Sequence, residues 1–286
     1  MKIWYEHWQI AFREKTEKKF RLIPNPSWGW AADPFLVRYK GELYLFAELY
    51  LYKSERNGVI GYCKFDGKEF GEWFVSMDKH WHISYPNVWV ENEKLYMCPE
   101  TCQAEELAIY ELIDFPDKWK KICVLLDNGK YADSTFLVHD KKKYLFTYQH
   151  AASRIDGNLL LYVMDDDGRV GKPLFISDDI SSARPGGNFI KRDEDLIRVS
   201  QDCSNGYGGS LVFSKVESVF PDYSEKELKR IYPESINGQW KKTFTGIHTY
   251  NCYDNIEVID LKYKTCSIKE YFARKRVRKV FTNKYR

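Results

Sequence analysis

Apolar and polar positions recur along this chain in five similar pairs of runs. Each pair has a segment rich in Val, Ile, Leu, Phe and Tyr, then a short polar turn, then a second such segment, which is the pattern of a β-hairpin. The pairs open at Asp33, Tyr85, Asp133, Arg184 and His248, at spacings of 52, 48, 51 and 64 residues. A period in this range predicts an array of like units that bury their apolar faces against one another.

A third apolar run follows each of the first four hairpins, and a charged turn and another β-rich segment come after it. The third runs are 59–65, 107–113, 159–165 and 210–216. Four strands per unit, without a convincing helix between units, predict an all-β, five-bladed β-propeller. Residues 2–12 are also patterned like a strand, and we expect them to complete the fifth blade and close the ring. A β-sandwich with chance similarity between its strands is the alternative.

Composition agrees with one propeller. The 286 residues contain no Pro/Gly/Ser-rich linker, which predicts a single domain over residues 1–272. The start, MKIWYEHW, has no uninterrupted apolar stretch, so we expect neither a secretory signal nor a transmembrane helix. The seven cysteines show neither CxxC pairs nor framework spacing. This favours a reduced, cytoplasmic protein whose cysteines are mostly buried in the blades, and it predicts no metal site.

Positive charge is concentrated in residues 273–286, which hold seven Lys or Arg and no acid although the whole chain carries a net charge of only +3. One interpretation is a solvated terminus. The other is a weak electrostatic contact with an anionic membrane surface, another protein or a nucleotide-bearing substrate. No other part of the sequence forms a basic face, so we expect no specific recognition of nucleic acid.

Candidate chemistry lies where the repeats open. The first strand of each propeller blade lines the central channel, so the five opening residues should face one another there. In the first four hairpins, a second polar residue lies as far from the turn as the opening residue does, and such residues face each other in an antiparallel pair. The predicted pairs are Asp33/Glu48, Tyr85/Glu100, Asp133/Tyr148 and Arg184/Gln201. They predict a polar site at one mouth of the channel, although a wet channel mouth would also tolerate such residues.

The carboxyl groups indicate acid–base chemistry. The like charges of Asp33 and Glu48 should raise the pKa of one of the two groups, while Glu100 or Asp133 supplies an ionised partner. A proton donor with a base or nucleophile is the working pair of glycosidic-bond chemistry, so Asp33, Glu100 and Asp133 are the catalytic candidates. The planar fork of Arg184 suits a carboxylate or phosphate. The predicted binding residues are Trp30, Glu48, Tyr85, Arg184, Gln201, Asp202, Tyr207 and His248.

Several strings carry a resemblance to a known family. WAADPFLVRYKGELYLFAE, SARPGG, QDCSNGYG and GIHTYN resemble the N-terminal propeller domain of plant glucosamine inositolphosphorylceramide transferases and of bacterial relatives that stand alone or are joined to formyltransferase-like domains. The likeness covers the chain from about Trp28 to Asp260. It implies a role in glycoconjugate or surface-polysaccharide assembly, with a sugar, nucleotide sugar or glycan as ligand and a glycosyltransferase or formyltransferase as partner. It implies no reaction for the propeller itself.

The hairpins are more distantly similar to five-bladed glycoside hydrolases of the arabinanase, xylosidase and invertase kinds. That similarity implies catalytic acids at Asp33 and Asp133. Those enzymes have a Glu as general acid where this chain has Arg184, so Glu100 or Glu48 would have to donate the proton. Some of them also hold a channel calcium through a fifth-blade His, which His248 resembles. The sequence offers no carboxylate cage around it, and we predict no cofactor.

Two functions remain open. One is an enzyme acting on a glycosidic or sugar-phosphate linkage through paired carboxylates. The other is a non-catalytic propeller that recognises a sugar or glycan for a separate glycosyltransferase. The clustered carboxyls favour the enzyme and Arg184 favours recognition or an anionic substrate; between the two, we favour the enzyme.

Overall fold

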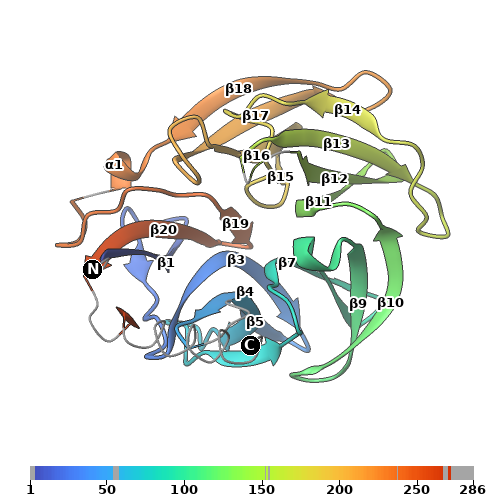
Figure 1. Cartoon of the computed structure of the whole chain (residues 1–286). Coiled ribbons are helices and arrows are strands. Elements are labelled where there is room, and N and C mark those ends of the chain that lie inside the picture. Colours follow the sequence, from blue (N-terminus) through green and yellow to red (C-terminus); the bar gives the residue numbers. More distant parts are fainter. Residues whose placement is uncertain are drawn as a thin grey trace, which may run out of the picture.

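The protein is a five-bladed β-propeller, as the sequence predicts. A computed structural model describes residues 4–53, 58–151, 153, 155–236, 238–266 and 270–271. Five four-stranded antiparallel sheets surround a common centre (Figure 1). The basic segment 273–286 lies outside the described residues. Within the described ranges, no helix has the length and apolar character that crossing a membrane requires.

Each blade is built from strands that follow one another in the chain, except the fifth. Blade 1 contains β3 (Gly29–Tyr39), β4 (Glu42–Leu51), β5 (Gly58–Lys64) and β6 (Phe74–Met77). Blade 2 contains β7 (Ser84–Glu91), β8 (Lys94–Glu100), β9 (Leu107–Asp114) and β10 (Lys118–Leu126), with the short 3₁₀-helix η1 (Cys102–Ala104) after β8. Blade 3 contains β11 (Tyr131–His139), β12 (Lys142–His150), β13 (Gly157–Met164) and β14 (Leu174–Ser177). Blade 4 contains β15 (Ile190–Arg192), β16 (Asp195–Asp202), β17 (Ser210–Ser218) and β18 (Ser224–Ile231), followed by the one-turn helix α1 (Pro233–Ile236).

The two ends of the chain meet in blade 5. Its strand order is β19 (Tyr250–Tyr253), β20 (Ile256–Cys266), β1 (Trp4–Glu14) and β2 (Arg21–Leu22). In Figure 1 the blue strand β1 lies beside the red strand β20. Their pairing runs without interruption from Trp4 opposite Cys266 to Glu14 opposite Ile256. The N-terminal strand therefore closes the ring as predicted, and it removes an open sheet edge.

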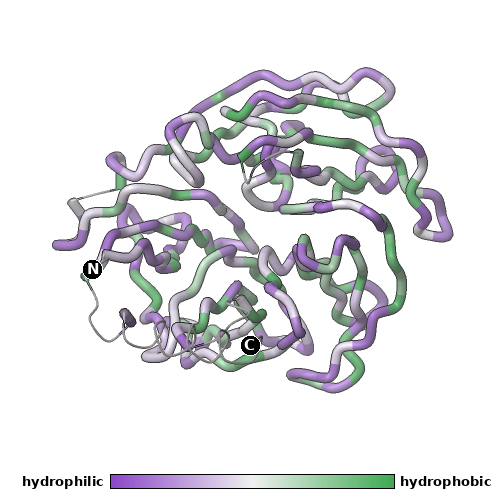
Figure 2. Tube along the Cα trace, in the orientation of Figure 1, coloured by the Kyte–Doolittle hydropathy of each residue, from purple (hydrophilic) through white to green (hydrophobic). Residues whose placement is uncertain are grey.

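Apolar side chains fill the spaces between neighbouring blades. Phe46 of blade 1 and Met97 of blade 2 belong to one buried cluster, and Phe146 of blade 3 and Val216 of blade 4 belong to another. Figure 2 shows apolar and polar segments alternating along the blades, with polar residues at many of the peripheral turns. Each blade thus buries its apolar residues only by packing on the next, which is why the period of the sequence predicts a ring.

The innermost strands of blades 1 to 3 each carry a β-bulge at their opening residue. Asp33, Tyr85 and Asp133 have φ angles of 53°, 44° and 48°, in the left-handed region. This conformation costs a non-glycine residue about 1–3 kcal/mol and occurs mainly where the surrounding structure enforces it. The same left-handed conformation recurs at the opening residue of three blades, and it marks this end of the channel as a candidate site.

The bulges also correct the predicted pairs by one residue. A bulge places two residues of one strand opposite a single residue of its partner, which simple counting from the turn cannot foresee. The observed pairs are Ala32 with Glu48, Ser84 with Glu100, and Ala132 with Tyr148.

Blade 4 keeps its predicted pair but begins later than expected. The main-chain amide of Gln201 donates to the main-chain carbonyl of Arg184 at 2.8 Å, and an isolated antiparallel β-bridge joins Pro185 and Ser200 beside it. The regular inner strands of blades 4 and 5 start only at Ile190 and Tyr250 rather than at the two opening residues.

Candidate functional site

The structure brings the five opening residues together at one mouth of the channel. Each is at most 4 % exposed. The Asp33 carboxylate accepts a hydrogen bond from the Tyr85 amide at 3.2 Å and lies 3.6 Å from Nε2 of His248. Arg184 donates to the Asp133 carboxylate. Two linked clusters result, one around Asp33 and the other around Asp133.

In the second cluster, Arg184 is held on all sides. Its Nε donates to Oδ2 of Asp133, and its guanidinium lies over the rings of Tyr148 and Tyr207, at 5.5 and 5.1 Å from their centroids. Such stacking stabilises a desolvated cation. Its Nη2 also lies 3.6 Å from Glu100. Two carboxylates thus engage this guanidinium inside the protein, and the geometry does not support the predicted clamp on an anionic ligand.

Gln201 completes the support of Asp133. Its Nε2 donates to Oδ2 of Asp133 and to the carbonyl of Pro185, both at 2.8 Å. Its Oε1 is buried and has no hydrogen-bond partner among the described residues. Gln201 is fully buried, so its side-chain amide holds the Asp133 carboxylate from the interior of the protein.

Glu100 is the most accessible of the acidic residues at this mouth. Its side chain is 12 % exposed, compared with 9 % for Glu48, 6 % for Asp33 and 3 % for Asp133. Burial and the negative charge of Asp133 raise the pKa of Glu100 to about 7, against the opposing effect of the nearby Arg184 cation. A carboxyl group with this pKa can hold a proton and give it up near neutral pH, as a general acid must.

The first cluster contains a residue that the sequence analysis missed. Asp260, on β20, is fully buried. Its carboxylate accepts hydrogen bonds from the amides of Asp33, His248 and Thr249 at 2.9–3.0 Å and lies 2.6 Å from Nδ1 of His248. An acid inside the apolar run IEVIDL was the available signal. Asp260 ties blade 5 to blade 1 and fixes the His248 ring.

Asp33 is equally engaged. Its Oδ1 accepts from the Thr249 hydroxyl at 3.0 Å. Burial, together with the charges of Glu48 and Asp133, raises its pKa well above the usual range, although the nearby His248 opposes the shift. A carboxyl group so buried and so placed braces the mouth more readily than it exchanges protons with a ligand.

The arrangement does not suit a channel calcium. Oxygen and nitrogen atoms of Asp33, His248 and Asp260 lie within 4.8 Å of one another. The Asp260 carboxylate is already saturated by amide donors, which leaves Asp33 as the other carboxylate of this group. Calcium takes 6–8 oxygen ligands, so these three residues do not fit it.

Aromatic rings form a wall at the same mouth. Trp8 stacks on His248 with ring centroids 3.8 Å apart, and Tyr207 meets the same imidazole edge-on at 5.2 Å. Trp30 stacks on Tyr50 at 4.6 Å, and its indole N–H has no hydrogen-bond partner among the described residues. Such rings suit the apolar faces of a sugar. The Trp30 indole N–H itself is buried and is not presented to a ligand in this arrangement. Trp8 comes from the closing strand β1, which the sequence did not assign to the site.

Two predicted binding residues have structural roles here. Tyr85 is fully buried, packs edge-on against Phe35 and shares a hydrogen bond with the Thr135 hydroxyl at 3.1 Å. The Asp202 carboxylate pairs with Arg230 of the outer strand and with the hydroxyl of Ser204. Neither side chain is available to a ligand in this arrangement.

The strings SARPGG and QDCSNGYG build the contact between blades 4 and 5. Gly187 has a φ of 141°, and a Cβ there would lie 1.9 Å from the carbonyl oxygen of Tyr250. Gly208 has a φ of 63°, and a Cβ there would lie 2.7 Å from the Trp8 ring and 3.0 Å from His248. Glycine is required at both places because the neighbouring blade leaves no room for a side chain.

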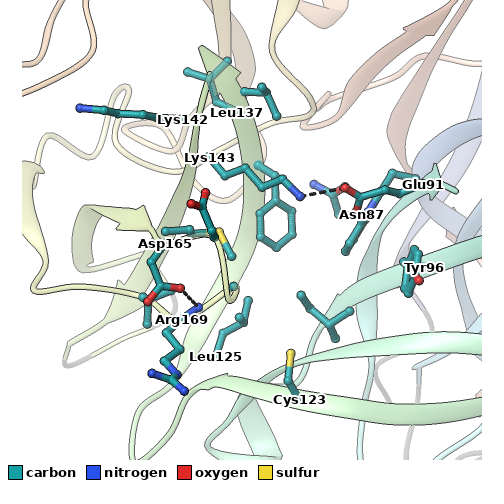
Figure 3. Close-up of a pocket in the computed structure, with 18 of the residues that line it drawn as sticks. Asn87, Glu91, Tyr96, Cys123, Leu125, Leu137, Lys142, Lys143, Asp165 and Arg169 are labelled. Atoms are coloured by element: carbon teal, nitrogen blue, oxygen red, sulfur yellow. Dashed lines mark hydrogen bonds and ion pairs between the residues drawn. The ribbon is translucent and has the colours of Figure 1, made fainter. Parts of the chain in front are cut away.

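A large cleft lies elsewhere. It has a volume of about 1370 Å³ and lies between blades 2 and 3, where Glu91 and Lys142 at the hairpin turns help to line it (Figure 3). Glu100 and Asp133 lie at the opposite ends of these strands. Trp89, Phe136 and the ion pair between Lys143 and Glu91 line the cleft. It contains none of the predicted site residues.

Comparison with known proteins identifies relatives over most of the propeller. The family described as glucosamine inositolphosphorylceramide transferase 1, N-terminal, matches residues 20–261. The glucosamine inositolphosphorylceramide transferase 1 of Arabidopsis thaliana is 30 % identical over 256 residues, which are 85 % of this chain and 32 % of the relative. The chain therefore spans about a third of the length of this relative.

Solved structures share the fold at much lower identity. An α-L-arabinofuranosidase of Clostridium thermocellum superposes with a TM-score of 0.55 at 13 % identity and covers 79 % of this chain and 80 % of its own. The catalytic domain of a GH62 α-L-arabinofuranosidase of Coprinopsis cinerea gives 0.57 at 11 % identity, with 88 % and 97 % covered. At these identities the likeness shows the propeller fold alone.

Proposed function

This chain belongs to the family of the N-terminal domain of glucosamine inositolphosphorylceramide transferase 1, and we propose that its channel mouth binds a sugar and that Glu100 donates a proton to a glycosidic oxygen. The observation that carries the proposal is the Glu100 carboxyl group. It combines a pKa of about 7 with the greatest exposure among the acids of the mouth.

The other charged residues prepare Glu100 for this role. Asp133 supplies the negative charge that favours the protonated form of Glu100, while Arg184 and Gln201 hold Asp133 in place. Asp33 is locked by Thr249 and braces the other side of the mouth. The catalytic role thus falls on Glu100, and Asp33 and Asp133 are positioning residues.

The balance of charge favours a neutral or cationic sugar. Five carboxyl groups converge on the mouth when Asp260 is included, and the Arg among them, Arg184, is already paired with two of them. An added anion would meet net repulsion at short range in a partly desolvated site. Glucosamine, the sugar named in the description of the relatives, carries an amino group that suits this environment.

The test is to compare binding and turnover in the wild type and in Glu100→Gln. A ligand panel of glucosamine, N-acetylglucosamine, UDP-N-acetylglucosamine, glucose 1-phosphate and arabino- and xylo-oligosaccharides is titrated by calorimetry and followed for products by mass spectrometry. Glu100→Gln should bind with unchanged affinity and lose turnover by at least about 100-fold, since the amide keeps the shape but has no acidic proton. Glu72→Gln, at an exposed position of blade 1, is the matched control and should retain both.

A second function has its own supporting observation. Asp33 and Asp133 each accept two hydrogen bonds from inside the protein, so neither stands out as a free base or nucleophile. This favours a propeller that recognises a sugar for a glycosyltransferase. Binding by the wild type without any product from the whole panel would support recognition and refute proton donation by Glu100.

A further inference from the structure

Three potential metal ligands of different chemistry meet at the rim of the channel mouth. Glu100 ends β8, Cys102 begins η1 two residues later, and His150 ends β12 of the neighbouring blade. A carboxylate oxygen, the thiol sulfur and a ring nitrogen of these residues all lie within 4.8 Å of one another. All three side chains are partly exposed, so an ion could enter from solvent without opening the propeller.

The donor set is selective. Thiolate and imidazole are the ligands that zinc prefers, and a carboxylate commonly completes its sphere. Three protein ligands with an open fourth position are typical of a zinc ion that binds water or substrate. Calcium and magnesium prefer all-oxygen sites and are not suited to this group.

Neighbouring contacts hold two of the ligands in place. The Cys102 thiol donates to the Tyr131 carbonyl oxygen at 3.0 Å, which places the sulfur at the cluster. Zinc would bind the thiolate, so this proton would be released to solvent when the metal binds. The His150 ring stands perpendicular to Tyr148, with centroids 5.4 Å apart. The first contact joins blades 2 and 3, and the second lies within β12 of blade 3, so the three ligands are brought together where these two blades meet.

The surrounding charge favours a dication. Asp133 and Glu48 lie at the same mouth as Glu100, and Arg184 offsets only part of their charge. A divalent cation at the cluster would relieve repulsion among carboxylates that burial otherwise strengthens.

We propose that Glu100, Cys102 and His150 form a zinc-binding site at the channel mouth. The spacing of the cysteines in the sequence gives no sign of it, because its ligands come from two blades. The inference does not depend on the proposed function. Where both hold, they exclude each other at any moment, because a Glu100 carboxylate bound to zinc cannot donate a proton.

The experiment measures metal uptake without any sugar. The reduced, metal-free full-length protein is titrated with Co²⁺, which reports thiolate ligation by charge-transfer absorption in the near ultraviolet, and Zn²⁺ is then added. We expect one Co²⁺ per chain with a thiolate band that Zn²⁺ removes. Cys102→Ser should abolish the band, and His150→Ala should weaken binding by at least about 100-fold, since even partners outside the coordination sphere contribute 10–100-fold.

Controls separate this site from adventitious binding. Cys123→Ser changes an exposed thiol on the outer strand β10 and should leave the spectrum and the affinity unchanged. Far-ultraviolet circular dichroism verifies that each variant is folded, and Glu100→Gln serves as the second ligand variant if Cys102→Ser does not fold. Absence of metal uptake by the wild type, or a thiolate band that persists in Cys102→Ser, would overturn the proposal. Neither result bears on sugar binding, so failure here is distinguishable from failure of the proposed function.

Discussion

The buried pair of Arg184 and Asp133 offers the sharpest test of how the channel mouth is held. The two side chains are 4 % and 3 % exposed, and the Arg184 Nε donates directly to the carboxylate. Arg184→Met keeps much of the volume but leaves Asp133 charged in the interior without its cationic partner, although Gln201 still donates to it. Removing one partner of a buried ion pair typically costs about 3–5 kcal/mol, so we expect a loss of this size in the free energy of unfolding.

Urea denaturation measures this loss. The nine tryptophans provide a fluorescence signal for tertiary structure, and circular dichroism follows the sheets independently. The double variant Asp133→Asn/Arg184→Met should recover part of the loss, because it leaves no unpaired charge behind. Recovery would show that the uncompensated carboxylate, and not the lost volume of the arginine, dominates the effect.

An exposed ion pair provides the control. Arg38 and Asp254 lie 3.1 Å apart with side chains 45 % and 60 % exposed. Solvent screens such a pair, so Arg38→Met should cost less than about 1 kcal/mol. If Arg184→Met costs no more than Arg38→Met, water reaches the Arg184 pair, and the assignment of Arg184 to internal support is refuted.

Two further predictions concern the pH dependence of stability and the glycine at the close contact between blades 4 and 5. The pKa of Glu100 is about 4.5 in the unfolded chain and about 7 in the folded protein, so the folded protein keeps a proton that the unfolded chain releases above about pH 4.5. The stabilisation from this proton is therefore complete below pH 4.5 and is lost as the pH rises through about 7. This loss is up to about 3 kcal/mol, and Glu100→Gln should remove it; urea titrations at several pH values that give parallel profiles for both proteins would contradict the assignment. Gly187→Ala should destabilise the protein by about 2–6 kcal/mol, because its Cβ would overlap the Tyr250 carbonyl oxygen in a left-handed backbone. Gly171→Ala, where a Cβ would lie 3.5 Å from its nearest neighbour, should be nearly neutral when both variants are compared by thermal denaturation. Equal losses of stability would show that the contact between blades 4 and 5 shifts to make room for the added Cβ.

The sequence alone determines the ring. Its period of about fifty residues and the four apolar, β-rich runs in most periods specify four strands per blade, because each blade can bury its apolar face only against the next. The same logic assigns the N-terminal strand to the last blade. These features follow from local pattern and repetition, and the structure confirms them.

The details of the mouth depend on tertiary structure. Bulges at Asp33, Tyr85 and Asp133 shift each facing pair by one residue, and a pattern of residue types carries no record of such a shift. Asp260 joins the site from a strand far along the chain, since its amide donors come from two different blades. Contacts of this kind depend on which blades meet, and only the closed ring decides that.

The same reason explains the fate of Arg184. As a residue type it suits an anionic ligand, and the sequence offers no reason to prefer another use. In the closed ring, Asp133 of blade 3 and Glu100 of blade 2 both pair with Arg184, which opens blade 4. A charged side chain is available for binding only if the fold leaves it unpaired, and pairing between blades is a property of the three-dimensional arrangement and not of the sequence pattern.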